Sequence, residues 1–259
     1  MTLPREELLA GSHHPQGLSQ LVDLAEEVLR TWQPCWSHFL AAPLQEEVLD
    51  RLGNLSELKW ERHGGHPAAE RCRLLCYRAD TPSSGAYPIH GLLIEGNFLF
   101  DRLSPADLRQ ALQTMGVADG ELGDVWVRGD RGGQGLCTPS AAAAIHNQIG
   151  HIRDVEIRCE SAAIEQLQLP VQRAPRRFSS VEASCRLDAI ASAGFGLSRA
   201  KIVNQIKAGR LRLNWTSIHQ ASRDLVCGDR LQLQDRGSLE VLSLAPTKRG
   251  RWRVELLRT

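Results

Sequence analysis

Apolar positions in the first sixty residues recur at three-and-four spacing, the period of amphipathic helices. The pattern is clear in LSQLVDLAEEVLRTW (residues 18–32) and FLAAPLQEEVLDRL (residues 39–52). Pro34 and Pro43 interrupt it, and HGGHP (residues 63–67) has the composition of a loop. We therefore predict an N-terminal helical region over residues 1–65.

Residues 66–168 show a different pattern, in which short apolar runs alternate with helical segments. Strands are predicted at RCRLLCYRA, PIHGLLIEGN, GDVWVR, GQGLCTP and RDVEIRCE, and helices at SPADLRQALQTMG and SAAAAIHNQIGH. From residue 89 the order is β-α-β-β-α-β, that of a ferredoxin-like (RRM-like) plait, and the earlier strand extends it. An RNA-recognition motif stacks bases on aromatic rings of its central strands. The matching segments hold no such ring, so we expect a scaffold or docking domain.

The basic, proline-bearing stretch LPVQRAPRRFSS (residues 169–180) is predicted to be a linker into a last domain, residues 181–259. That domain opens with a short helix near Arg186. A second helix follows over residues 198–208, with Ser198 as N-cap and Gly209 in the left-handed conformation after its end. In the next strand, alternation places Leu211, Leu213 and Trp215 inward, and their neighbours outward. The predicted class for the whole chain is α+β.

Charge divides the chain unequally, although its net charge is only +1. Residues 1–170 carry 14 Lys and Arg against 23 Asp and Glu, a net −9, whereas residues 171–259 carry 17 against 7, a net +10. A basic segment of this size attached to an acidic body indicates an anionic partner for the C-terminal part.

The helix over residues 198–208 carries Arg199 and Lys201 in its first turn, where positive charge opposes the helix dipole. Each such charge costs roughly 0.3–1 kcal/mol. Backbone N–H groups at a helix start favour phosphate, and cations beside them add charge-assisted donors. A bound phosphate would thus turn a local cost into binding energy.

Three blocks, RLD opening a helix, GLSRAKIVNQIKAGRLRLN and GDRLQL, resemble in this order the alpha-L RNA-binding motif of small-subunit ribosomal protein S-four. Upstream, GGHPAAERCR, the plait and Asn214-Trp215 resemble the YlmH family, whose cyanobacterial and plastid members are often labelled photosystem II S-four-domain proteins. The resemblance implies a ribosome-associated binder of structured rRNA or tRNA, with the large ribosomal subunit as partner. The chain departs from the motif at Ser238-Leu239-Glu240, where more of an arginine-glycine run is expected.

The candidate RNA-binding residues combine the charge pattern with this resemblance. They are Arg186, Ser198, Arg199, Lys201, Gln205, Lys207, Arg210, Arg212 and Asn214. Asp188 is expected to complement its helix start, and Trp215 and Trp252 are expected in the core.

Catalysis and cofactors are not predicted. RLD imitates the triplet with the catalytic aspartate of pseudouridine synthases, but here it runs into AIASAGFGLSR instead of a Thr-Ser-Gly-Leu type stretch. RGDRGGQG lies between two adjacent predicted strands and suits a hairpin, not the glycine loop of a methyltransferase. Seven scattered cysteines without C-x-x-C, and His63 and His66 alone in a loop, do not form a metal-ligand pattern.

Two alternatives to an RNA-binding function remain. The acidic front half could serve a protein-interaction scaffold or a photosystem-related assembly factor, and an rRNA-modifying enzyme is the weaker option. No apolar run reaches the roughly 18 residues of a membrane span, and the N-terminus lacks a secretory pattern. We expect a cytoplasmic protein that is not inserted in a membrane; the sequence does not predict its oligomeric state.

Overall fold

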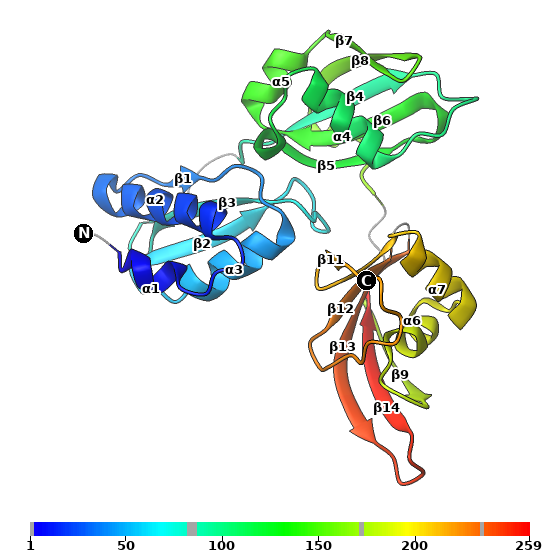
Figure 1. Ribbon diagram of the computed structural model, residues 1–259. Helices are drawn as coiled ribbons and strands as arrows, with labels where there is room; N and C mark the ends of the chain where they lie inside the picture. Colours follow the sequence, from blue (N-terminus) through cyan, green and yellow to red (C-terminus); the bar gives the residue numbers. More distant parts are fainter. Residues whose placement is uncertain (1–2, 82–86, 171–173, 234–235) are drawn as a thin grey trace. The chain divides into compact units, whose positions relative to one another are not determined.

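The computed structural model describes every residue except 1–2, 82–86, 171–173 and 234–235 (Figure 1). It contains two compact units, Met1–Pro170 and Val171–Thr259, which are the segments on either side of the charge division. Helices and strands are mixed throughout, which confirms the α+β class. In the described part of the chain no helix is long and apolar enough to cross a membrane.

The first unit begins with helices packed on a small antiparallel sheet with strand order β1-β3-β2. The elements are α1 (Arg5–Leu9), α2 (Pro15–Thr31), β1 (Cys35–Trp36), α3 (Ala42–Leu52), β2 (Leu58–His63) and β3 (Arg73–Arg78). The prediction that residues 1–65 form a separate helical region is therefore wrong at its end. Strand β3 pairs with β2 along its whole length and is not an extension of the plait, because its partners precede it in the chain.

The rest of the first unit is a five-stranded antiparallel sheet with the order β5-β6-β4-β8-β7. The elements are β4 (His90–Gly96), α4 (Pro105–Thr114), β5 (Leu122–Val127), β6 (Gly132–Cys137), α5 (Pro139–Ile145), β7 (Ile149–Ile152) and β8 (Val155–Ala162), with short 3-10 turns at Asp119–Glu121, Gly129–Arg131 and Ile164–Gln166. Without β7, the order is that of a ferredoxin-like plait. Strand β7 takes residues that we predicted to continue the preceding helix.

One face of this sheet is covered by residues from outside the plait. Phe39 and Leu167 pack there with Ile89 and Leu136, and Trp126 lies against the same cluster. An RNA-recognition motif needs its sheet surface open for bases. The covered face favours a packing role for this plait.

The loop between β2 and β3 is hydrogen-bonded to the plait. The carboxylate of Asp124 accepts hydrogen bonds from the backbone N–H groups of Glu70 (2.8 Å) and Arg71 (2.9 Å). The Arg71 guanidinium in turn donates to the carbonyl oxygen of Leu122 (2.9 Å) and pairs with Asp119 (2.8 Å). The segment that follows β2 is thus fixed by residues of the plait.

The second unit is a six-stranded antiparallel sheet, order β11-β10-β12-β13-β14-β9, with two helices on one face. Its elements are β9 (Arg176–Glu182), α6 (Leu187–Phe195), α7 (Arg199–Lys207), β10 (Leu211–Leu213), β11 (Thr216–Ser217), β12 (Arg230–Leu233), β13 (Gly237–Pro246) and β14 (Trp252–Arg258). Helix α6 packs closely on the sheet, because a Cβ atom at Gly194 would lie 2.1 Å from Cδ2 of Leu239 in β13.

The linker prediction for residues 169–180 is wrong at its C-terminal end. Residues 171–173 lie outside the described residues, but Arg176 onward forms β9, which pairs with β14 over seven residues on each strand. The apolar positions of β9 are too few for sequence periodicity to reveal it, since Phe178 alone packs against the core.

Candidate nucleic-acid interface

Helix α7 begins and ends at the residues that local sequence signals indicate. Ser198 is its N-cap, with Oγ accepting from the Lys201 backbone N–H at 3.4 Å, and Gly209 has φ +68° just after its C-terminus. Leu197 packs against the core that contains Ile202, as a hydrophobic staple requires. The Ser192 hydroxyl donates to the Leu197 carbonyl at 2.6 Å and fixes the turn between α6 and α7.

The first turn of α7 holds two exposed cations, Arg199 and Lys201, and no acidic residue. Among the residues that the structure describes, no carboxylate forms an ion pair with Lys201. The N-terminal N–H groups and this ammonium group together form a local concentration of positive potential. Gln205 and the exposed Lys207 lie farther along the same helix.

Arg186, a predicted RNA-binding residue, is already engaged by a carboxylate of its own helix start. Its guanidinium is bidentate on Asp188, at 3.0 Å (Nε to Oδ1) and 3.1 Å (Nη2 to Oδ2). Burial opposes ionisation of Asp188, but the hydrogen bond and charge of Arg186 and the charge of Arg199 outweigh it, so the pKa of this carboxyl lies below its ordinary value. Asp188 thus serves the α6 start, as predicted, and holds both arginines electrostatically.

The predicted cations do not share one face of the unit. Leu211 and Leu213 of β10 point into the core with α6 and α7. Because successive strand residues point to opposite faces, Arg212 lies on the outer face of the sheet, away from the helices, where it neighbours Gln232 of β12. Arg210 precedes the strand and donates its backbone N–H to the Gln205 carbonyl at 2.9 Å. The structure therefore divides the candidates between a helix side and a sheet side.

Asn214 has a structural role that the sequence did not reveal. Its amide donates to the buried carboxylate of Asp229 at 2.8 Å, and its Oδ1 accepts from the Arg230 backbone N–H at 2.9 Å. Asp229 also accepts from the Val226 N–H at 2.8 Å. The Asn214 side chain thus ties the β10–β11 turn to the turn before β12.

Trp215 is not a core residue, contrary to the alternation argument. Strand β10 ends at Leu213, and Asn214 (φ +47°) and Trp215 (φ +69°) form a two-residue turn between the paired Leu213 and Thr216. Such a turn prefers glycine at its second position, and a left-handed conformation costs an ordinary residue roughly 1–2 kcal/mol. Trp252, by contrast, packs partly against the core.

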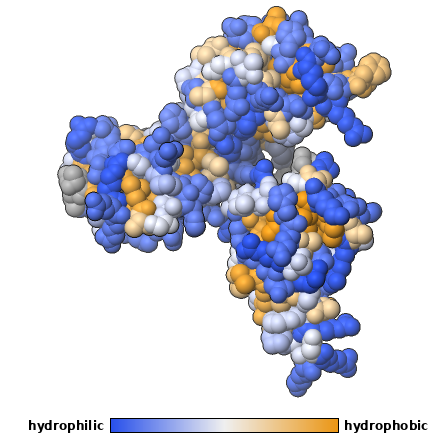
Figure 2. All heavy atoms as spheres, viewed as in Figure 1, coloured by the Kyte–Doolittle hydropathy of each residue, from blue (hydrophilic) through white to orange (hydrophobic). Residues whose placement is uncertain are grey.

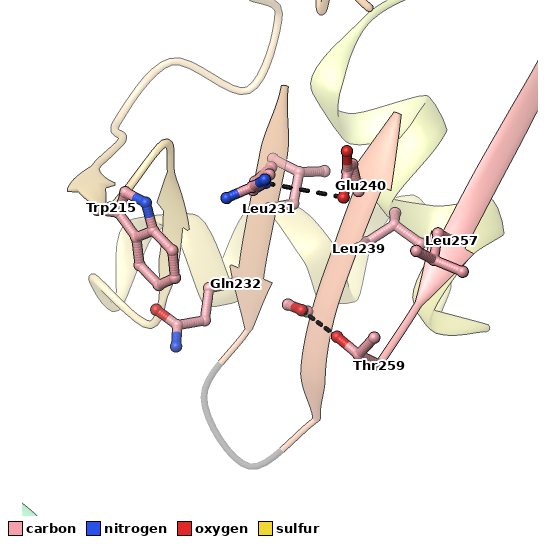
Figure 3. A pocket seen from close by; sticks show the side chains of 9 residues that line it. Trp215, Leu231, Gln232, Leu239, Glu240, Leu257 and Thr259 are labelled. Atoms are coloured by element: carbon pink, nitrogen blue, oxygen red, sulfur yellow. Dashed lines mark hydrogen bonds and ion pairs between the residues drawn. The ribbon is translucent and has the colours of Figure 1, made fainter. Parts of the chain in front are cut away.

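A cavity of about 220 Å³ lies on the outer sheet face beside this turn. Figure 3 shows Trp215 on one side of it with Gln232, and Glu240, Leu257 and Thr259 across. Arg230 lines the cavity too and pairs with Glu240 at 3.7 Å. Sequence reasoning missed this site, because its members come from three strands, a turn and the C-terminal residue.

The β13–β14 hairpin carries further cations. Its closing turn holds Lys248, Arg249 and Arg251, with Gly250 at φ +70°. Hydrophilic residues gather at this end of the hairpin in Figure 2.

The loop histidines do not gather ligands for a metal. His63 stacks on Tyr87 with ring centroids 3.8 Å apart, whereas the buried His66 lies 3.6 Å from the Asp124 carboxylate. Across the described residues, no cluster of three or more His, Cys, Asp or Glu side chains could hold a metal ion. That no metal is needed stays a prediction.

The architecture is that of an α+β protein in which a plait-containing body precedes a basic unit of two helices on a sheet. Residues 13–81 match the family model described as YlmH, N-terminal. The chain is 22% identical over 214 residues to the ribosome-associated protein quality control protein P2 of Bacillus subtilis, covering 82% of each chain. The chain thus resembles the YlmH family in sequence.

The chain is also similar to a solved structure, the cell division protein ylmH from Streptococcus pneumoniae. The two are 19% identical with a TM-score of 0.48, over 59% of this chain and 93% of that one.

Proposed function

We propose that this protein binds structured rRNA or tRNA through its basic second unit, without catalysis, as a cytoplasmic factor that associates with the large ribosomal subunit. The observation that carries the proposal is the start of α7, where two exposed cations lie beside backbone donors and the first turn holds no acidic residue. The name of the Bacillus subtilis relative supports the association with ribosomes. The net +10 of residues 171–259 supports an anionic ligand.

Arg199 and Lys201 oppose the helix dipole at the start of α7. A phosphate bound there accounts for their position better than simple exposure to solvent does. Lys201 weakens the helix through the dipole, but beside a phosphate it supplies a charge-assisted hydrogen bond. Gln205 and Lys207 extend the helix side of the surface, and Arg212 lies across the sheet. Recognition of this kind uses RNA backbone and shape, so it requires no catalytic group.

Substitution of Lys201 by Ala tests the proposal in the full chain. Affinity for an rRNA hairpin should fall, and the slope of log K against log salt should shrink by about one unit for the lost phosphate contact. Folding stability should hold or rise by about 0.3 kcal/mol, since an opposed charge is removed. Lys248→Ala removes an exposed lysine of the same unit outside α7, and should matter less.

Arg199→Ala is expected to weaken RNA binding too, but it is the less clean variant. Its charge helps to keep Asp188 ionised, so its removal also affects the α6 start. A lower melting temperature for Lys201→Ala, with affinity and salt slope unchanged, would show that the α7 start is structural and would refute the proposal.

RNA binding by the two separate units, and sedimentation of the full chain with ribosomal subunits, test the proposed function further. Residues 171–259, a compact unit, should bind the hairpin at physiological salt, and residues 1–170 should bind much more weakly; equal affinities would contradict the charge argument. The full chain should sediment with large ribosomal subunits or their tRNA complexes in normal or stalled-translation extracts. Protein partners that survive nuclease treatment would favour the scaffold alternative.

A further inference from the structure

The turn between β10 and β11 places a large aromatic residue where the backbone favours glycine. Trp215 has φ +69° directly after Asn214 at +47°. Asn suits the first position of such a turn, but the second is one that a bulky side chain rarely takes. Strained residues of this kind occur where the side chain has a use that outweighs the strain. The ring of Trp215 is therefore the feature to explain.

The surroundings of the ring define the chemistry of a ligand. Trp215 is partly exposed and borders the cavity on the outer sheet face, together with the amide of Gln232 and the carboxylate of Glu240. A volume of about 220 Å³ is smaller than the roughly 300–1,000 Å³ of pockets for drug-sized ligands. An aromatic plane next to hydrogen-bonding groups suits one planar, polar ring.

Charge specifies the ligand further. Arg230 lines the cavity, and Arg212 is the cross-strand neighbour of Gln232. Both cations belong to a unit with a net charge of +10. An aromatic side chain beside an amide and arginines is the combination with which proteins hold unpaired nucleotides, by stacking on the base and contacting its edge and phosphate.

We propose that Trp215 is a stacking platform for one unpaired nucleobase of the bound RNA, with Gln232 contacting the base edge and Arg212 or Arg230 the adjacent phosphate. This inference rests on the RNA-binding function proposed above, but it uses the face of the sheet opposite to α7. It predicts that the protein prefers RNA with an unstacked nucleotide over a continuous duplex.

The experiment compares two short RNA hairpins that differ by one bulged nucleotide, tested with each of the four bases, against the full chain. Trp215→Gly should weaken binding of the bulged hairpin by about 5- to 150-fold, the range typical for loss of one base–aromatic stack. Binding of the paired hairpin and the salt slope should not change, because no phosphate contact is removed. Trp215→Phe should retain affinity within about threefold.

Folding supplies the control. Glycine adopts the left-handed conformation without strain, so Trp215→Gly should melt no lower than the wild type while binding bulged RNA more weakly. Trp252→Phe, a change to another tryptophan of the same unit, should not alter discrimination between the hairpins.

The outcomes separate the two proposals. A wild type that binds both hairpins equally, or a Trp215→Gly variant that discriminates like the wild type, overturns the stacking role even if Lys201→Ala weakens binding. Free nucleoside monophosphates that bind as tightly as the bulged hairpin would mark a nucleotide site and also overturn it. Absence of RNA binding by the wild type would refute the proposed function itself.

Discussion

Replacement of Asn214 by alanine should destabilise the second unit by about 4 kcal/mol. The amide donates to the Asp229 carboxylate and accepts from the Arg230 N–H. A hydrogen bond to a charged group contributes roughly 1.5–3 kcal/mol and a neutral one about 1 kcal/mol. Alanine at φ +47° adds about 1 kcal/mol of backbone strain.

Asn214→Gly separates these contributions. Glycine loses the same two hydrogen bonds but takes the left-handed conformation without strain, so it should cost about 3 kcal/mol. The difference of about 1 kcal/mol between the variants measures the backbone alone. Hydrogen exchange of the paired strands β10 and β12 in the intact protein reports this free energy of opening.

RNA binding completes the test of Asn214. The folded fraction of Asn214→Gly should keep its affinity for the paired hairpin, which does not use Trp215, because the Asn214 amide is committed to the turn. If Asn214→Ala leaves exchange protection unchanged and lowers RNA affinity about tenfold, the side chain is an RNA contact, as strand alternation first suggested, and the structural argument is refuted.

Three further predictions concern charge, thiols and cofactors. Arg186→Ala should destabilise the protein at pH 7, and this effect should shrink as pH falls below the ordinary pKa of the Asp188 carboxyl and through its lowered folded pKa, because protonation removes the charge that Arg186 stabilises. A urea-midpoint shift that stays the same as pH is lowered would contradict this. Iodoacetamide at pH 8 should label the exposed Cys227 first, since burial raises the pKa of Cys72 and Cys159 to about 11; mass spectrometry of the native protein shows the order, and prompt labelling of either buried thiol would count against the packing. Purified protein should contain no stoichiometric metal by elemental analysis, and nucleotides or S-adenosylmethionine should give no large thermal shift; a positive result in either assay defeats the cofactor-free expectation.

Local signals predicted the α6–α7 region well because each depends on neighbours in the chain. The N-cap Ser198 and the left-handed Gly209 are both encoded within a residue or two of the helix ends. The β-α-β-β-α-β order could likewise be deduced from successive short segments.

Features that depend on strand pairing could not be predicted in the same way. The partners of β3 lie upstream of it, and β9 pairs with β14, more than seventy residues later. Alternation predicted the outward face of Arg212 correctly, but Trp215 left the expected alternation because the strand ended two residues earlier. Periodicity gives the alternation along a strand but does not indicate where the strand stops.

The Asp124 contacts also constrain how the protein is made. Glu70 and Asp124 are 54 residues apart in the chain, and synthesis at roughly 5–20 residues per second separates their appearance by about 3–11 s. During that interval strands β1–β3 have been synthesised, but Asp124, whose carboxylate accepts hydrogen bonds from the Glu70 and Arg71 amides, has not. The N-terminal part should therefore reach its final structure late, in step with the plait that follows it.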